Sequence, residues 1–184
     1  MKSAISSYLF VALSLLTLQA LAAMPPQSGE KAPDWILSTA DGERISLYAD
    51  SEGQQAVIIF WATWCPYCAK LMPELEKLRR ELNQHDIAFY ALNVWEEANP
   101  KAYLKKHDLN FKLLMQAEDV AQRYGVGGTP GLFVTDAEKN ITYIRMPGTS
   151  NEEAIAAVKA ALGVAGPKTQ SDDDEARTAE TQQL

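Results

Sequence analysis

The stretch Val57 to Cys68 reads Val-Ile-Ile-Phe-Trp-Ala-Thr-Trp-Cys-Pro-Tyr-Cys and determines how the rest of the chain is interpreted. Its first half is a continuous apolar run rich in β-branched residues, which predicts a strand buried on both faces. The residues after it carry leucines at spacings of four and three, as an amphipathic helix does: Leu71, Leu75, Leu78 and Leu82. The sequence therefore places two cysteines where a buried strand becomes a helix.

This position has a chemical consequence for the cysteines. The first turn of a helix has unpaired N–H groups and the positive end of the helix dipole, and both favour a thiolate over a thiol. Cysteines so placed, or in Cys-x-x-Cys pairs, have pKa values of about 3.5–7.5, compared with about 8.5 for a free cysteine. Cys65 lies nearer the exposed helix end, so we predict that it is the nucleophile. Cys68 lies one turn further in and can reach back to Cys65.

The N-terminus predicts export. Lys2 is followed by an apolar run from Tyr8 to Leu18, and Ala20-Leu21-Ala22 supplies an A-x-A cleavage motif. We therefore expect residues 1–22 to be a signal peptide and the protein to be periplasmic. An uncleaved inner-membrane anchor is the alternative, although this run is shorter than the ~20 apolar residues that a membrane span needs.

The number of cysteines indicates their use. The chain has two cysteines, and an exported protein is in a compartment that permits disulfides. A bridge over so short a loop would stabilise the fold by only about 2 kcal/mol. We therefore interpret Cys65 and Cys68 as a redox-active disulfide that needs no further cofactor.

Composition and charge divide the 184 residues into segments. We expect a flexible leader at 23–30, one domain at 31–165 and a disordered acidic tail at 166–184, where five acidic residues face two basic ones. The formal net charge is −7, and no basic patch stands out. Nucleic-acid binding is therefore not expected.

The remaining patterns predict an α/β fold. Asp41-Gly42 is a hairpin turn signal between two short strands, at 35–39 and 44–47. Further strands are expected at 57–61, 87–94, 132–135 and 141–146, and helices at 66–81, 100–107, 119–124 and from a capping box at 150–153. Alternation of strand and helix gives parallel central strands. We expect a central mixed β-sheet flanked by helices, with an N-terminal β-hairpin extension.

A second informative stretch, Gly125 to Gly131, reads Gly-Val-Gly-Gly-Thr-Pro-Gly, which demands unusual backbone geometry. Combined with Trp-Ala-Thr-Trp-Cys-Pro-Tyr-Cys at 61–68 and a helix proline at 73, it resembles the thioredoxin superfamily. The lead-in, with Asp-Trp-Ile-Leu at 34–37 and Ile-Ser-Leu at 45–47, is similar to the exported TlpA/ResA/DsbE branch. The resemblance spans residues 31–163.

The resemblance implies a thioredoxin-like fold and a thiol-disulfide oxidoreductase in which Cys65 attacks and Cys68 resolves. It also implies that Pro130 is a cis-proline facing the cysteines, and X-Pro is the one peptide bond for which cis is cheap. The backbone of Thr129 is then free to pair with a substrate. Substrate contacts are expected at Trp64, Pro66, Tyr67, Thr129 and Pro130. The aromatic residues near the cysteines form either an apolar rim that docks substrate or partly buried packing, and the sequence favours neither: Trp61, Trp64, Tyr67 and Trp95.

The same resemblance implies partners. Similarity to this branch implies that the protein reduces exported proteins that carry thiols or disulfides, including those of cytochrome c maturation. It also implies that a membrane-bound partner supplies the electrons. The chain departs from its relatives at three places: Pro66-Tyr67 lies between the cysteines, Leu71 replaces a glutamate, and Ile59 replaces a buried aspartate. Glu96 or Glu97 then become candidates to accept the proton of Cys68.

Two other functions fit the same cysteines. A thiol peroxidase-like antioxidant enzyme needs a Pro-x-x-x-Thr-x-x-Cys setting and a nearby arginine, which the sequence around Cys65 does not supply. A copper-binding chaperone would use the two thiolates, but His85 and His107 are the only imidazoles and lie among charged residues. No metal site is expected.

Overall fold

The computed structural model describes residues 24–83 and 85–164. Within them, strand β3 (Gln55–Trp61) lies between a parallel neighbour, β4 (Ile87–Asn93), and an antiparallel one, β6 (Gly131–Thr135). The complete sheet has seven strands in the order β2-β1-β5-β4-β3-β6-β7. The remaining strands are β1 (Ile36–Thr39), β2 (Arg44–Ser46), β5 (Lys112–Met115) and β7 (Ile141–Ile144). The predicted mixed sheet is confirmed.

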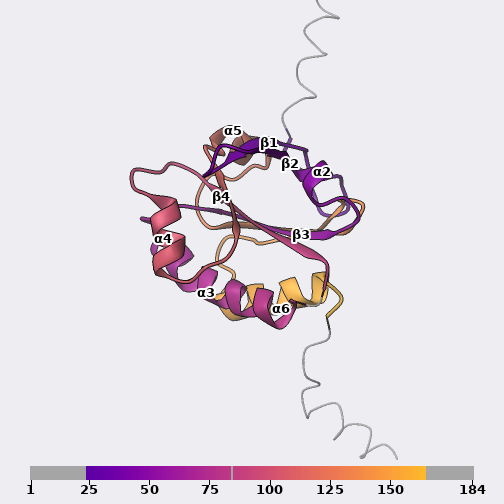
Figure 1. Cartoon of the computed structure of the whole chain (residues 1–184). Helices are drawn as coiled ribbons and strands as arrows, with labels where there is room; N and C mark the ends of the chain where they lie inside the picture. Colours follow the sequence, from indigo (N-terminus) through magenta and orange to yellow (C-terminus); the bar gives the residue numbers. More distant parts are fainter. Residues whose placement is uncertain (1–23, 84, 165–184) are drawn as a thin grey trace, which may run out of the picture.

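Helices cover both faces of this sheet. The long helix α3 (Pro66–Glu81) and α6 (Asn151–Ala161) lie side by side beneath β3, and α5 (Glu118–Arg123) lies on the opposite side (Figure 1). Helix α4 (Pro100–Lys106) leads from β4 toward β5. All four helices were predicted within one or two residues of their ends, and three of them, α3, α4 and α6, begin with a capping side chain. In α6 the predicted capping box of Ser150 and Glu153 is present.

Strand β3 contributes to two apolar cores. Val57, Ile59 and Trp61 pack with α3 and α6, whereas Ile58 and Phe60 pack with α5 on the other face. Successive side chains of a strand point to opposite faces of the sheet, so a strand without polar residues is buried on both faces. The end of this doubly buried strand fixes where the cysteines emerge.

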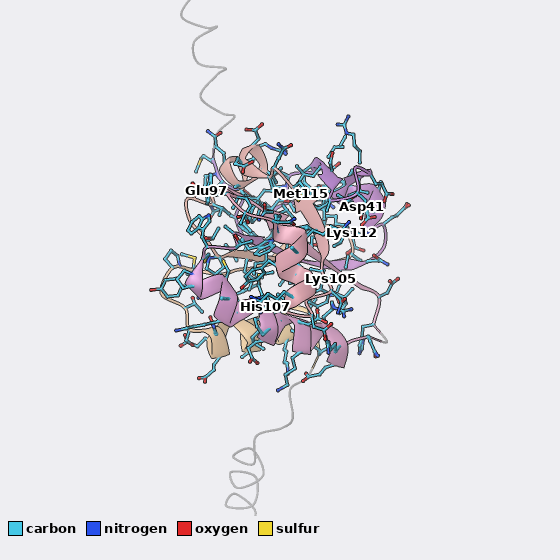
Figure 2. All side chains as sticks on the ribbon, turned by 60° about the vertical axis from the view of Figure 1, so that its left-hand side comes forward. Asp41, Glu97, Lys105, His107, Lys112 and Met115 are labelled. Carbon is cyan, nitrogen blue, oxygen red and sulfur yellow. The ribbon has the colours of Figure 1, made fainter. Side chains whose placement is uncertain are left out.

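Two elements differ from the prediction. Residues 47–50 form a short helix, α2 (Leu47–Asp50), in which the Ser46 hydroxyl accepts the N–H of Ala49. Residues 112–115, for which the sequence predicted neither a strand nor a helix, form strand β5. Because β5 pairs with both β1 and β4, the β1–β2 hairpin continues the main sheet. Figure 2 shows Lys112 and Met115 of β5 beside Asp41 of the hairpin turn.

The leader also differs, because residues 24–30 pack against the domain. The N–H of Gly29 donates to the carbonyl of Ile141 at 2.8 Å, and that of Ala32 donates to Lys139 at 2.9 Å. Pro26 is buried. The chain therefore enters the domain along β7. The expected signal peptide at 1–22 and acidic tail at 166–184 lie outside the described residues.

None of the helices within the described ranges is long and apolar enough to cross a membrane.

Gly125 gives a testable consequence of the leader's position. Its φ is +70°, and a Cβ on this residue would collide with the ring of Pro25. We expect Gly125→Ala to lower the free energy of unfolding by about 2–4 kcal/mol, from left-handed backbone strain plus the collision. Urea denaturation measures it.

Gly163→Ala is the matched control, because Gly163 has a φ of +68° but open space around its Cβ position. The Gly163→Ala variant should lose only the contribution of backbone strain to the free energy of unfolding, about 1–2 kcal/mol. Adding Pro25→Gly should restore Gly125→Ala to the level of this control. Equal losses in the two alanine variants would show that the contact with Pro25 has no energetic importance.

Candidate active site

Cys65 is the N-cap residue of α3. Its sulfur accepts the backbone N–H of Cys68 at 3.2 Å, and Pro66 follows at the first helical position, where a missing N–H removes no hydrogen bond. The loop from Ala62 to Trp64 connects this cap to β3, and the N–H of Cys65 donates to the Ala62 carbonyl at 3.2 Å. A donor and a helix N-terminus are thus directed at the Cys65 sulfur, which favours the charge of a nucleophilic thiolate.

The two cysteines are free thiols with their sulfurs 2.6 Å apart. Cys65 is 2% exposed and Cys68 is 1% exposed. Cys65 was expected to be the more exposed of the two cysteines, but they differ little in exposure to solvent because a neighbouring loop covers Cys65 as well. A substrate must approach this sulfur through the surface formed by that loop and the first turn of α3.

The covering loop is the glycine-rich stretch found in the sequence. The bond between Thr129 and Pro130 is cis, as expected, and the Thr129 carbonyl lies 3.5 Å from the Cys65 sulfur. The Thr129 N–H has no hydrogen-bond acceptor among the described residues. The loop therefore brings an unused backbone donor close to the nucleophile.

Three aromatic side chains surround the cysteines at the surface. Trp64 is 54% exposed, Tyr67 66% and Trp95 38%. Trp61, for which the sequence left a surface rim and buried packing open, is fully buried and packs against Tyr103 at 5.4 Å between ring centroids. It is buried because it still belongs to β3, whose side chains face the cores.

Glu96 holds the reactive loop in place. Its carboxylate accepts the N–H of Thr63 at 3.0 Å, the Thr63 hydroxyl at 2.6 Å and the Asn93 amide at 2.8 Å. It also accepts the N–H groups of Glu97 and Ala98, each at 3.0 Å. These five donors tie the end of β3 to the segment after β4.

This bonding gives Glu96 a role other than the one predicted. Burial alone would raise its pKa, but the hydrogen bonds from Thr63 and Asn93 outweigh burial and lower the pKa to about 2. A carboxylate with so low a pKa is a poor proton acceptor at neutral pH. The prediction missed the structural role because the donors come from separate segments.

The segment after β4 also holds Trp64. The indole N–H of Trp64 donates to the Trp95 carbonyl at 2.7 Å, and the N–H of Trp95 donates to Glu118 at 2.7 Å. Trp95 has a φ of 48°, an uncommon value for a bulky residue. Two adjacent residues, Trp95 and Glu96, thus fix both Trp64 and Thr63 immediately before Cys65.

Cys68 lies among apolar side chains. Ile59 and Leu71, the positions where the family resemblance implied carboxylates, belong to the same buried cluster as the two cysteines. Burial, followed by the hydrogen bond with Cys65, raises the pKa of the Cys68 thiol above its ordinary value of 9.0. Cys68 therefore keeps its proton at neutral pH until a disulfide forms at Cys65.

The raised pKa predicts a pH dependence of stability in the reduced protein. The folded state holds the Cys68 proton more tightly than the unfolded state, so this stabilisation is complete below about pH 9 and is lost above it. We expect the free energy of unfolding of the reduced protein to fall by up to about 1.4 kcal/mol per pH unit there. Urea denaturation at pH 8 to 10.5 measures it.

The oxidised protein is the control, because it has no thiol at this position, and of its tyrosines with a raised pKa Tyr103 alone feels the charge of the cysteines. The free energy of unfolding of the reduced protein should fall relative to that of the oxidised protein as the pH rises. Cys68→Ala, which cannot form the disulfide, should lack this fall in its own free energy of unfolding. A difference that stays constant across this range would contradict the assigned proton.

Neither histidine belongs to a metal-binding group among the described residues. His107 ends α4 and stacks on Tyr103, with 4.3 Å between ring centroids, and Figure 2 shows it on α4 near Lys105. Among the residues that the structure describes, no group of three or more His, Cys, Asp or Glu side chains could hold a metal ion.

Comparison with known proteins identifies the family. The AhpC/TSA family model matches residues 28–144, more than half of the chain. The chain belongs to the AhpC/TSA family. The matched segment contains the strand, the two cysteines and the Thr129–Pro130 loop, so the family assignment rests on the site as well as the sheet.

Relatives of this family member carry more specific names. Thioredoxin-like protein YneN of Bacillus subtilis (strain 168) is 32% identical over 131 residues, 69% of this chain and 76% of the relative. Thiol-disulfide oxidoreductase ResA of Geobacillus thermodenitrificans (strain NG80-2) is 31% identical over 129 residues, 69% of this chain and 73% of the relative.

A solved structure shows the same fold. The crystal structure of a thiol:disulfide interchange protein of the thioredoxin family from Chlorobium tepidum TLS superposes with a TM-score of 0.62 at 26% identity. It covers 77% of this chain and 99% of its own. The resemblance to the thioredoxin superfamily is confirmed, and the chain is a thioredoxin-like thiol-disulfide oxidoreductase of the ResA type.

Proposed function

We propose that this protein reduces disulfides of exported proteins, with Cys65 as the attacking residue and Cys68 as the resolving residue. The observation that carries the proposal is the Cys65 sulfur itself. It lies at a helix N-terminus, 3.2 Å from the Cys68 N–H, 3.5 Å from the Thr129 carbonyl and 2.6 Å from the second sulfur. A nucleophile, a resolving thiol and an unused backbone donor thus meet at one place.

The reaction proceeds in two exchanges. The Cys65 thiolate attacks one sulfur of a substrate disulfide, which breaks that bond, forms a mixed disulfide and releases one substrate thiolate. Cys68 then attacks the Cys65 sulfur, which releases the second substrate thiol and leaves a Cys65–Cys68 disulfide. The substrate gains two electrons, which the protein loses, and its two sulfurs take up one proton from Cys68 and one from the solvent, to which Cys65 had already released its own.

The Cys68 proton passes to water or to the departing substrate thiolate. Glu96 is not used, because its carboxylate already accepts five hydrogen bonds and has a pKa of about 2. Resolution therefore begins with that proton transfer, which gives Cys68 the thiolate that attacks the Cys65 sulfur.

Substrate binding uses the surface next to Cys65. The exposed rings of Trp64 and Tyr67 offer apolar contact, Pro66 separates them, and the free N–H of Thr129 pairs with an extended peptide beside Pro130. The proposed partners are periplasmic proteins with thiols or disulfides, including those of cytochrome c maturation. A membrane-bound donor returns the protein to its reduced form.

The direction of electron flow is tested by the equilibrium potential of the Cys65–Cys68 couple against glutathione. Thioredoxin-like proteins range from about −270 to −120 mV. A value below about −250 mV supports the reductase, whereas a value above about −150 mV would make the protein an oxidant or isomerase. Hydrogen peroxide consumption by the reduced protein, measured in parallel, distinguishes the thiol peroxidase alternative.

A further inference from the structure

A groove of about 960 Å³ lies next to the reactive cysteines. Its walls come from four segments: the leader at 25–27, the start of α3, the loop at 124–131 and the segment from the end of β7 to the start of α6 at 144–151. Tyr67, Thr129 and Pro130 belong to its lining, so the groove is continuous with the surface around Cys65.

The charge of this groove is opposite to that of the protein. Its lining contains two charged side chains, Lys70 and Arg145, and no aspartate or glutamate. The chain as a whole carries a formal net charge of −7. The groove is therefore a small basic site on an acidic protein.

Both cations keep hydrogen-bond donors for a ligand. Among the described residues, neither Lys70 nor Arg145 has a carboxylate oxygen within the 4.0 Å of an ion pair, whereas Arg79, Arg80, Lys101, Lys112 and Lys159 each have one. One terminal nitrogen of Arg145 donates to the Thr149 carbonyl, and its Nε is buried without an acceptor among the described residues. A carboxylate entering the groove would meet unneutralised positive charge.

The two cations flank the substrate path from different walls. Lys70 lies on α3 one turn after Tyr67, on the same side of the helix. The backbone N–H of Arg145 donates to the Leu132 carbonyl at 2.9 Å, which places Arg145 beside β6 just after Pro130. A peptide that pairs with Thr129 therefore extends past both positive charges.

We propose that this groove binds an extended segment of the substrate protein that carries acidic side chains beside its reactive cysteine. Lys70 and Arg145 are then residues that determine substrate specificity. This inference rests on the proposed exchange reaction at Cys65, and it adds the class of sequence that the reaction selects.

The test compares two peptide disulfides. Each is a dimer of one short peptide joined through its single cysteine, with aspartates on both sides of the cysteine in one peptide and lysines in the other. The second-order rate constant for oxidation of the reduced protein is followed by tryptophan fluorescence. At 0.15 M salt, the repulsion from distant acidic residues is largely screened, so the groove dominates.

We expect the aspartate peptide to react about 5–20 times faster with the unmodified protein, since exposed charge pairs change affinity by about 2–5-fold each. Lys70→Glu should reverse or abolish the preference, and Arg145→Gln should reduce it by about 2–5-fold. Lys77→Gln is the matched control, because Lys77 lies two turns further along α3 and outside the groove. It should keep the full preference.

Equal rate constants for the two peptides, or a preference that survives Lys70→Glu, would overturn the specificity inference while leaving the exchange reaction intact. Failure of both peptides to oxidise the reduced protein would instead refute the proposed function. Lys70 is exposed, so the Lys70→Glu variant tests the inference even if Arg145→Gln disturbs the contact with Thr149.

Discussion

Cys65→Ser is expected to abolish disulfide reduction, with a loss of at least about a thousandfold in turnover, because a serine hydroxyl at neutral pH cannot replace a thiolate as the attacking group. The sulfur lost is the one at the helix N-terminus, with the Cys68 N–H directed at it. Insulin reduction, with dithiothreitol as the electron source, measures the loss after subtraction of the rate without protein.

Cys68→Ser provides the complementary result. This variant should still form the mixed disulfide at Cys65 but should not resolve it, so a covalent complex with a substrate should accumulate and disappear on addition of a reductant. Non-reducing gel electrophoresis detects it. Activity remaining in Cys65→Ser, or a stable adduct in that variant and none in Cys68→Ser, would reverse the assigned roles.

Glu96→Ala is expected to have the second largest effect. Five donors lose their acceptor, and those of Thr63 and Asn93 lie in the interior of the site. We expect a loss of about 2–4 kcal/mol in the free energy of unfolding. Movement of the loop before Cys65 should lower turnover by a further ~10–100-fold, since a shift of about 1 Å is enough to misalign reacting groups.

The neighbouring Glu97 supplies the control. Its side chain is exposed, and Figure 2 shows it at the edge of the molecule. Glu97→Ala should leave both stability and turnover nearly unchanged. Glu96→Gln should lie between the two alanine variants, because an amide oxygen accepts some of these hydrogen bonds without the charge. If Glu96→Ala retained full activity in folded protein, the loop would not need this anchor.

The sequence was sufficient to predict the sheet and the cysteine site because their signals are local. A short apolar run rich in β-branched residues predicts a doubly buried strand, and the leucine period after Cys68 predicts helix α3. The glycines before Pro130 likewise mark a loop of special geometry. In each case, consecutive residues carry the whole signal.

The features that the sequence did not predict depend on contacts between distant segments. Glu96 was considered only as a proton acceptor, because its bond to Thr63 joins residues 33 positions apart. Trp61 stayed open between a surface rim and buried packing, because no local pattern shows that the strand ends only after it. The ordered leader depends on a fit between Pro25 and Gly125, which no local pattern reveals.

The ordered leader has a practical consequence for how the protein is handled. Residues 25–27 form one wall of the groove, so any fusion partner, purification tag or surface attachment introduced just before Met24 starts beside the proposed substrate groove. Attachment after Val164 starts instead from the end of α6, whose last turn lies outside the groove lining. Reagents built for capture experiments should therefore carry their handle on the C-terminal side.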